Sequence, residues 1–210
     1  VTKNIKLGSA VTVRSSSGPL RIYQAFATLD QLRNGLAGLM AGRGSFIESF
    51  PLYGYNLNDY NQLFEEKLEL LVALNREQPI TWNGKFRAPL QDQTVLPRAV
   101  NNHLAIWVAV GGTPESVVRA AKLGLPVMFA IIGGNPTQFQ PLFQYYKELY
   151  QHFGHDAKNF NVGVHMHSFF GENSKQTADY YYPVYSAQMN RVGASRGWGA
   201  FSRSQYDQGR

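Results

Sequence analysis

Residues 104–134, LAIWVAVGGTPESVVRAAKLGLPVMFAIIGG, decide the fold class of this 210-residue chain. The segment 104–110 is an almost unbroken apolar run, which is typical of a strand buried on both faces. Thr113-Pro114 then supply the cap and the first position of a helix, and Gly124 ends that helix. The same plan begins again at Leu125, so this stretch predicts two consecutive strand-helix units with parallel strands.

The remaining sequence repeats this alternation of strand and helix. Apolar or alternating segments predict strands at residues 5–13, 36–41, 104–110, 125–132 and 161–170. Amphipathic segments predict helices at residues 19–33, 56–76, 114–122, 136–154 and 174–192, the last of them interrupted at Pro183. Such units fit either an open doubly wound sheet or a (β/α)8 barrel, and five units cannot close a barrel of that kind.

One segment departs from the alternation. Residues 80–86, ITWNGKF, place Asn83-Gly84 between apolar and β-branched residues, which is the strongest short signal for a β-hairpin. The prolines on either side make a central strand unsuitable here, because proline lacks the N–H that such a strand donates. We therefore expect a single domain over residues 1–210, with a small hairpin insertion near residues 80–88.

Composition and charge argue against several classes of protein. The hydrophobic share of 44% and the 13% of aromatic residues are too high for a disordered chain. No apolar run reaches the ~18 residues that a membrane-spanning helix needs. The formal net charge of +6 is spread along the chain without a basic cluster. The first residues lack the layout of a signal peptide and the chain has no cysteine, so we expect a cytoplasmic protein that binds neither membranes nor nucleic acid.

The turn Gly111-Gly112-Thr113-Pro114-Glu115-Ser116 is the first candidate for a ligand site. It precedes a helix whose first backbone N–H groups have no partner within the helix and whose dipole favours an anion. The hydroxyls of Thr113 and Ser116 can donate to a phosphate, whereas Glu115 would repel one. The alternative is a helix start with an ordinary threonine cap. The spacing matches neither the P-loop nor GxGxxG, which argues against ATP and against NAD bound in the Rossmann manner.

Arg43 is the second candidate, because it stands between two glycines just after a predicted strand. Open and closed parallel α/β sheets both bind their ligands at this end of the strands. The guanidinium fork of an arginine also suits a phosphate. The alternative is an exposed loop arginine without a ligand.

His165 and His167 lie two residues apart on a predicted strand, so their side chains should share one face. Two imidazoles placed in this way can bind one metal ion, as they do in metal-dependent amidohydrolases. The other histidines fall in predicted loops or helices, and no strand end offers the remaining ligands. The alternative is a pair of polar residues that line a pocket without a metal.

The order of these segments resembles the bacterial luciferase-like monooxygenase family, whose members are flavin-dependent (β/α)8 barrels. The resemblance covers nearly the whole chain and is carried by IKLGSAVTV, SSSGPLRIYQAFATLDQL, AGRGSFIESFPLYGYNLNDY, the stretch quoted at the start and VGVHMHSFFGENSKQTADYYYPVY. It implies an α/β fold of the TIM-barrel type, in which this chain supplies strands three to seven of an incomplete barrel. We expect strands one, two and eight to be absent, and with them the family's catalytic histidine, so the catalytic residues are unknown.

The resemblance also implies a cofactor and its contacts. FMN is the expected cofactor, and the deazaflavin F420 is the alternative. The phosphate is expected beside four residues of the two candidate turns, Arg43, Gly112, Thr113 and Ser116. The flavin ring would lie against Ala10 and Val11, where the family often has a non-proline cis peptide bond. The substrate pocket would be lined by Ile131, His165 and His167.

The implied function is that of an FMN-dependent oxidoreductase or monooxygenase, which uses reduced flavin and O2 to transfer one oxygen atom to a small organic substrate. The implied partners are a flavin reductase that supplies the reduced cofactor and further copies of the same chain. Two alternatives stay open. The chain is either a catalytically silent partial barrel that retains flavin binding, or an amidohydrolase-type barrel that binds a metal through His165 and His167.

Overall fold

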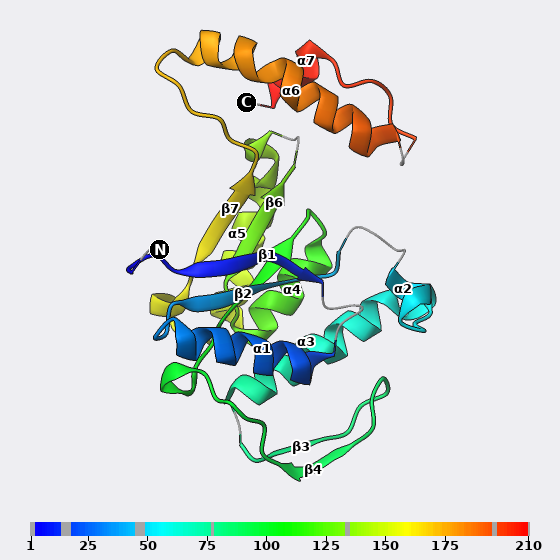
Figure 1. Cartoon of the computed structure of the whole chain (residues 1–210), viewed down its shortest axis with the longest axis vertical. Helices are drawn as coiled ribbons and strands as arrows, with labels where there is room; N and C mark the ends of the chain where they lie inside the picture. Colours follow the sequence, from blue (N-terminus) through cyan, green and yellow to red (C-terminus); the bar gives the residue numbers. More distant parts are fainter. Residues whose placement is uncertain are drawn as a thin grey trace.

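The computed structural model describes residues 3–13, 18–44, 49–76, 78–132, 135–194 and 197–209. Five parallel strands form its main sheet in the order β1-β2-β5-β6-β7, and this sheet curls without closing (Figure 1). The strands are β1 (Leu7–Val13), β2 (Ala37–Gly42), β5 (Ala105–Val110), β6 (Val127–Ile131) and β7 (Val162–Met166). The parallel α/β architecture that the sequence predicts is confirmed.

Helices connect these strands. The long helices are α1 (Pro19–Leu32), α3 (Tyr60–Arg76), α4 (Pro114–Leu123), α5 (Gln140–His152) and α6 (Ser174–Ala194). The short ones are α2 (Ser49–Leu52), η1 (Leu57–Asp59), η2 (Val100–Asn102), η3 (Pro136–Phe139), η4 (Ala157–Asn159) and α7 (Arg203–Gln208). None of the helices in the described part of the chain is long and apolar enough to cross a membrane.

The predicted interruption at Pro183 was wrong, because α6 continues through this residue. A proline inside a helix removes one backbone hydrogen bond, and the remaining bonds are enough to carry this helix from Ser174 to Ala194. Helices α6 and α7 pack against each other beyond the ends of β6 and β7 (Figure 1).

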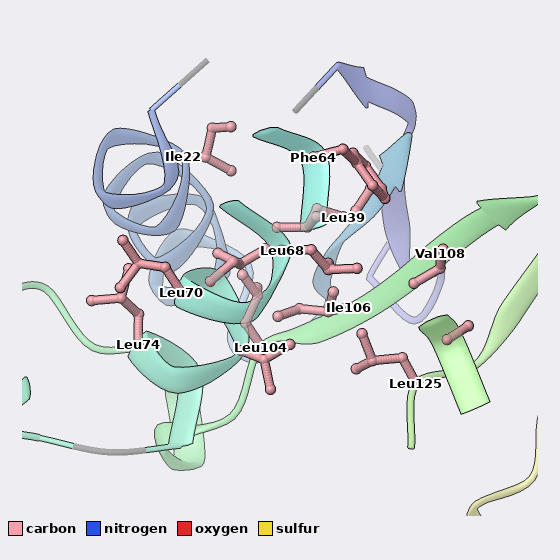
Figure 2. Packing of buried hydrophobic residues seen from close by; sticks show 14 of the residues in the cluster. Ile22, Leu39, Phe64, Leu68, Leu70, Leu74, Leu104, Ile106, Val108 and Leu125 are labelled. Atoms are coloured by element: carbon pink, nitrogen blue, oxygen red, sulfur yellow. The ribbon is translucent and has the colours of Figure 1, made fainter. Parts of the chain in front are cut away.

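The core lies between the sheet and helices α1, α3, α4 and α5. Figure 2 shows Leu68 of α3 beside Leu39 of β2 and Ile106 of β5, and all three side chains are buried. Leu70 and Leu74 of α3 also belong to this cluster. Burying a leucine side chain stabilises a fold by roughly 1.5–3 kcal/mol, so α3 anchors the middle of the sheet.

Burial alternates along the central strand β5. Val108 and Val110 are fully buried, whereas Trp107 and Ala109 are only half-buried. The prediction that this strand is buried on both faces was therefore wrong. Successive side chains of a strand point to opposite faces, and the helices of this sheet cover one face only. Five strands do not curl far enough to bury the other face against itself.

The hairpin that the sequence predicts near residues 80–88 is displaced along the chain. Its strands are β3 (Ile80–Trp82) and β4 (Leu90–Gln93), which pair antiparallel. Asn83-Gly84 belongs to a longer loop and does not form the two-residue turn that the sequence predicts. The reason is a tertiary contact, because Glu66 of α3 binds backbone N–H groups of this loop.

Asp30, near the end of α1, is almost completely buried although it is acidic. Its carboxylate accepts hydrogen bonds from the backbone N–H groups of Ala37 (3.0 Å), which begins β2, and of Val100 (2.9 Å) in η2. A buried polar group costs free energy unless it is hydrogen-bonded, and these two bonds offset that cost. Asp30 therefore fixes where β2 begins relative to α1.

We expect Asp30→Ala to lower the free energy of unfolding by about 2–4 kcal/mol, because it leaves two buried N–H groups without an acceptor. Asp30→Asn keeps one carbonyl oxygen and should lose less. Urea unfolding followed by circular dichroism measures both variants. Equal losses for the two would contradict the idea that hydrogen bonding by this side chain stabilises the junction.

Candidate functional site

Arg43 and Thr113 meet at the carboxyl edge of the sheet. Strands β2 and β5 are parallel neighbours, so the residues that follow them lie close together. Arg43 directly follows β2, and Thr113 follows β5 after Gly111-Gly112. The guanidinium of Arg43 donates from Nη2 to the Thr113 hydroxyl at 3.2 Å and from Nη1 to Asn61 Oδ1 at 2.8 Å. The two candidate turns of the sequence therefore form one site.

Ser116 completes this group, since its hydroxyl lies 2.8 Å from that of Thr113 and its side chain is buried. We call Arg43, Asn61, Thr113 and Ser116 the Arg43 cluster. Thr113 occupies the N-cap position of α4, yet its hydroxyl makes no capping bond to the helix. Thr113 at the cap and Pro114 at the first helical position are as the alternative expects, but the Thr113 hydroxyl bonds to Arg43 and Ser116 instead of the helix.

The turn before α4 leaves room beside the backbone. Gly112 has a φ of 116°, a conformation that residues with a side chain rarely adopt. A Cβ atom built at Gly111 or Gly112 would meet no atom of the described residues within 4 Å. Helix α4 begins at Pro114, directly after this turn, and the positive end of its dipole favours an anion there.

A second cation lies within electrostatic reach of the cluster. Among the residues that the structure describes, the buried Nε and Nη1 atoms of Arg119 in α4 have no hydrogen-bond partner. Burial is the main cause that lowers the pKa of this guanidinium, the charge of Arg43 lowers it further, and Glu65 raises it. Glu115, one turn earlier on α4, also raises this pKa, so the acidic residue expected to repel a phosphate interacts with Arg119. Glu69 raises this pKa as well, so three carboxylates offset the charge of Arg119, and Arg43 is the cation of the cluster itself.

Sequence reasoning missed Asn61 and Arg119. Neither residue belongs to a motif, because each occupies an ordinary polar position of an amphipathic helix. Their placement follows from the packing of α3 beside α4, where the Arg119 guanidinium lies 5.4 Å from the ring centre of Phe64. No local signal in the sequence marks such a contact between two helices.

Ala10 and Val11 are joined by a non-proline cis peptide bond, at the position that the resemblance implies. The bond lies where β1 shifts its register against β2. Val11 packs beside Gly42, since a Cβ atom at that glycine would come within 2.7 Å of the valine side chain. Gly42 directly precedes Arg43, so this bond lies beside the Arg43 cluster.

A pocket of about 640 Å³ opens at the carboxyl ends of β6 and β7. Ile131 and His167 line it together with aromatic side chains of α6, and we call it the aromatic pocket. Phe169 stacks on Tyr181 with ring centres 4.8 Å apart, and His167 lies edge-on to Tyr185 at 5.5 Å. The lining is therefore rich in rings, with a histidine at the strand end.

His165 does not line the aromatic pocket. It lies within β7, exposed and paired with Ala130 of β6, whereas His167 follows the end of the strand. Within the residues that the structure describes, no group of three or more His, Cys, Asp or Glu side chains is placed to hold a metal ion. The described part of the chain therefore lacks the set of metal ligands that the amidohydrolase alternative requires.

The fold and the site define a class: a parallel α/β half-barrel with a cationic cluster at the carboxyl edge of its sheet. The chain matches the luciferase-like monooxygenase family over residues 1–209, and it belongs to this family. The family resemblance and the TIM-barrel type of fold that the sequence predicts are thereby confirmed.

Individual relatives agree with this assignment. An alkanal monooxygenase alpha chain of Photorhabdus luminescens is 26% identical over 159 residues, which make up 75% of this chain and 43% of the relative. The solved monooxygenase RslO1 of Streptomyces bottropensis has a TM-score of 0.76 at 21% identity, over 98% of this chain and 66% of that chain. The chain thus spans less than half of the curated relative and about two thirds of the solved structure.

The oxygenating constituent of 3,6-diketocamphane monooxygenase of Pseudomonas putida, solved in complex with FMN, has a TM-score of 0.74 at 16% identity. The match covers 99% of this chain and 65% of that chain. Other solved enzymes that share the fold depend on coenzyme F420. At sequence identities this low, the structural similarity shows only that these proteins share a fold. Enzymes with this fold include ones that bind FMN and ones that depend on F420.

We expect Gly112→Ala to lower the free energy of unfolding by about 1–3 kcal/mol, because a side chain is strained at a φ of 116°. Gly111→Ala is the matched control. A Cβ atom there also meets open space, and the backbone is not in the strained region, so the change should stay within about 0.5 kcal/mol. Urea unfolding compares the two, and equal losses would contradict the prediction.

Proposed function

We propose that this protein is an FMN-dependent monooxygenase or a closely related oxidoreductase, in which the Arg43 cluster binds the phosphate of FMN. The observation that carries the proposal is the hydrogen bond from Arg43 to Thr113, which joins two strand-end turns into one cationic site. Membership of the luciferase-like monooxygenase family supports flavin chemistry at this edge of the sheet.

The cluster offers the donors that a phosphate needs. Arg43 presents a charged planar fork, and Thr113 and Ser116 present two hydroxyls on neighbouring positions. The N-terminus of α4 adds a favourable dipole and backbone N–H groups. Gly112 allows phosphate oxygens to approach the backbone closely, since no side chain of the described residues lies within 4 Å of the position its Cβ would take.

The charges favour FMN over F420. FMN ends in a phosphate monoester, and a group of this kind carries about −1.5 to −2 charge at neutral pH. The phosphate within F420 is a diester, which carries a single charge and has no free end. Glu65, Glu69 and Glu115 offset the charge of Arg119, so the preference for a terminal dianion rests on Arg43 and on the dipole at the start of α4.

The flavin ring would extend from the Arg43 cluster past Ala10 and Val11 toward Ile131. The aromatic pocket, which Ile131 also lines, would then hold the organic substrate beside the ring. Its aromatic walls suit the apolar part of such a substrate, and Thr177, Gln205 and Asp207 add polar groups to the lining. His167 belongs to this wall and lies edge-on to Tyr185, whereas His165 lies outside the pocket.

Reduced FMN, when bound, supplies the electrons with which one atom of O2 enters the organic substrate and the other leaves as water. The residues of this chain hold the phosphate, orient the ring and keep water away from the pocket. A flavin reductase as the source of reduced cofactor, self-association and a cytoplasmic location stay predictions.

We expect the protein to bind FMN about tenfold or more tightly than riboflavin, which has the same ring without the phosphate. Arg43→Gln should weaken FMN binding by about 10- to 100-fold and leave riboflavin binding unchanged, because it removes a charge-assisted hydrogen-bond donor. Titrations that follow the quenching of flavin fluorescence measure all of these affinities.

Arg191→Gln is the control for the change in net charge, because this exposed arginine of α6 lies far along the chain from the cluster. It should bind FMN like the unaltered protein. Equal affinities for FMN and riboflavin would overturn the proposed phosphate site. Binding of neither flavin would overturn the proposed cofactor.

A further inference from the structure

Tyr185 is a buried polar side chain in the wall of the aromatic pocket. It lies on α6, lines the pocket and is only 8% exposed. Its hydroxyl forms no hydrogen bond with any other residue that the structure describes. A buried hydroxyl costs free energy unless it finds a partner, so this group is suited to bond with a ligand that enters the pocket.

Neighbouring rings hold Tyr185 in place. The ring centres of four side chains lie 5.4 to 5.7 Å from that of Tyr185, and they belong to His167, Tyr181, Phe201 and Tyr206. These rings come from three segments of the chain, the residues after β7, helix α6 and the region of α7, which meet beyond the ends of β6 and β7 (Figure 1). The position of the Tyr185 hydroxyl is therefore set before a ligand binds.

The Tyr185 hydroxyl keeps its proton at neutral pH. Burial is the main cause that raises the pKa of this phenol, and the neighbouring Tyr181 and Tyr206 raise it further. A protonated phenol donates one hydrogen bond. The matching group on a ligand is an oxygen that accepts a hydrogen bond.

The wall opposite the polar group offers the flat face of a ring. Phe169 is 47% exposed and lies parallel to Tyr181, with an angle of 4° between the ring planes and 4.8 Å between the ring centres. Both residues line the pocket. A planar aromatic ligand can extend such a stack, and stacking contributes beyond the burial of apolar area alone.

Charge in the pocket favours a neutral ligand. Among the lining residues that the structure describes, Asp207 is the acidic one, and its carboxylate forms an ion pair with Arg203 at 2.8 Å. An anionic ligand would meet this carboxylate at short range, which costs free energy. A cation would offer no acceptor to the Tyr185 hydroxyl.

We propose, on the basis of the function proposed above, that the aromatic pocket binds a neutral aromatic substrate whose oxygen accepts a hydrogen bond from Tyr185. The ring of this substrate stacks on the wall that Phe169 and Tyr181 form. The pocket volume of about 640 Å³ leaves room for a molecule larger than a single ring. Tyr185 thereby selects the polar group of the substrate, and Phe169 selects its flat shape.

Two simpler ligands satisfy only part of this pocket. An aromatic hydrocarbon would stack on Phe169 and leave the Tyr185 hydroxyl without a partner. A saturated molecule with the same oxygen would bond to Tyr185 and lose the stacking. An aromatic ring with an accepting oxygen uses both features.

The hydrogen bond is tested with 2-acetylnaphthalene and with 2-ethylnaphthalene, which has the same rings and no oxygen. Tyr185→Phe removes only the hydroxyl, so it should weaken binding of the ketone about five- to tenfold and leave binding of the hydrocarbon unchanged. Equilibrium dialysis followed by gas chromatography measures both affinities. Unchanged affinity of the variant for the ketone, or no saturable binding of the ketone to the unaltered protein, would overturn the proposal.

Infrared difference spectra report the bond directly. The carbonyl stretch of the bound ketone, labelled with ¹³C at the carbonyl carbon, should move to lower wavenumber in the unaltered protein and not in Tyr185→Phe. Equal spectra would show that the oxygen bonds elsewhere and would contradict the role of Tyr185.

Tyr180→Phe is the matched control. Tyr180 is an exposed tyrosine of the same helix and does not line the pocket, so the same chemical change should leave both affinities as they are. Urea unfolding of Tyr185→Phe should show no loss of stability, because its hydroxyl has no partner among the described residues. A large loss would indicate a structural role for the hydroxyl and contradict the proposal.

The stacking wall has its own test. Phe169→Leu keeps an apolar side chain at this half-exposed position and removes the ring. It should weaken binding of 2-acetylnaphthalene by about two- to tenfold and leave unchanged the binding of 2-acetyldecalin, the saturated counterpart. Equal losses for the two ketones would overturn the preference for an aromatic substrate.

These measurements are made without flavin, so their outcome is separate from that of the FMN titrations. Arg43→Gln alters the proposed phosphate site and should bind 2-acetylnaphthalene like the unaltered protein. Ketone binding that depends on Tyr185 in a protein that binds no flavin would overturn the flavin function and support this pocket. Tight FMN binding together with ketone binding that ignores Tyr185→Phe would do the reverse.

Discussion

The parallel pairing of β2 with β5 is the constraint on which the candidate site depends. Its register sets Leu39 beside Ile106 and Ala41 beside Val108, so the two strands end within one residue of each other. Arg43 and Thr113, 70 residues apart in the chain, come within hydrogen-bond distance as a result. A slip of one residue along β5 would move the two turns by roughly 3.3 Å and turn the strand's buried side chains to the other face. The core and the site therefore require the same register.

Buried polar side chains fix the start of both strands. Asp30 of α1 accepts a hydrogen bond from the backbone N–H of Ala37, where β2 begins. Asn75 of α3 pairs with Leu104 just before β5, donating to its carbonyl and accepting from its N–H, both at 2.9 Å. Each contact ties the amino end of a strand to a helix, and the leucines of α3 then hold the strands from one side. The position of the carboxyl ends, and of Arg43, follows from these anchors.

Local signals explain how much of this could be predicted. Apolar runs, helix starts and glycine stops are visible in the sequence, so the strand-helix units, their parallel order and the turns that hold Arg43 and Thr113 were predicted correctly. Arg43 bonds to Thr113 and to Asn61 because β2 pairs with β5 and α3 packs nearby. No local sequence pattern encodes which strands pair, so these contacts could not be predicted. The hairpin was misplaced for a similar reason, since Glu66 on another element outweighs the turn preference of Asn83-Gly84.

In the proposed function, the two faces of the sheet have different parts. The face covered by helices supports the binding of the phosphate, and the opposite face would shield the reacting groups from water. The Arg43 cluster is assembled from strand ends and helices that pack on the covered face, and an anion needs only its donors and the dipole of α4. Oxygen chemistry at a flavin also needs water to be excluded, and that depends on the opposite face. There Trp107 and Met128 are half-buried and His165 is exposed. Under the proposed function, a chain with the cluster intact binds FMN whether or not it oxidises a substrate, so the silent partial barrel and the active enzyme would share the phosphate site and differ in turnover.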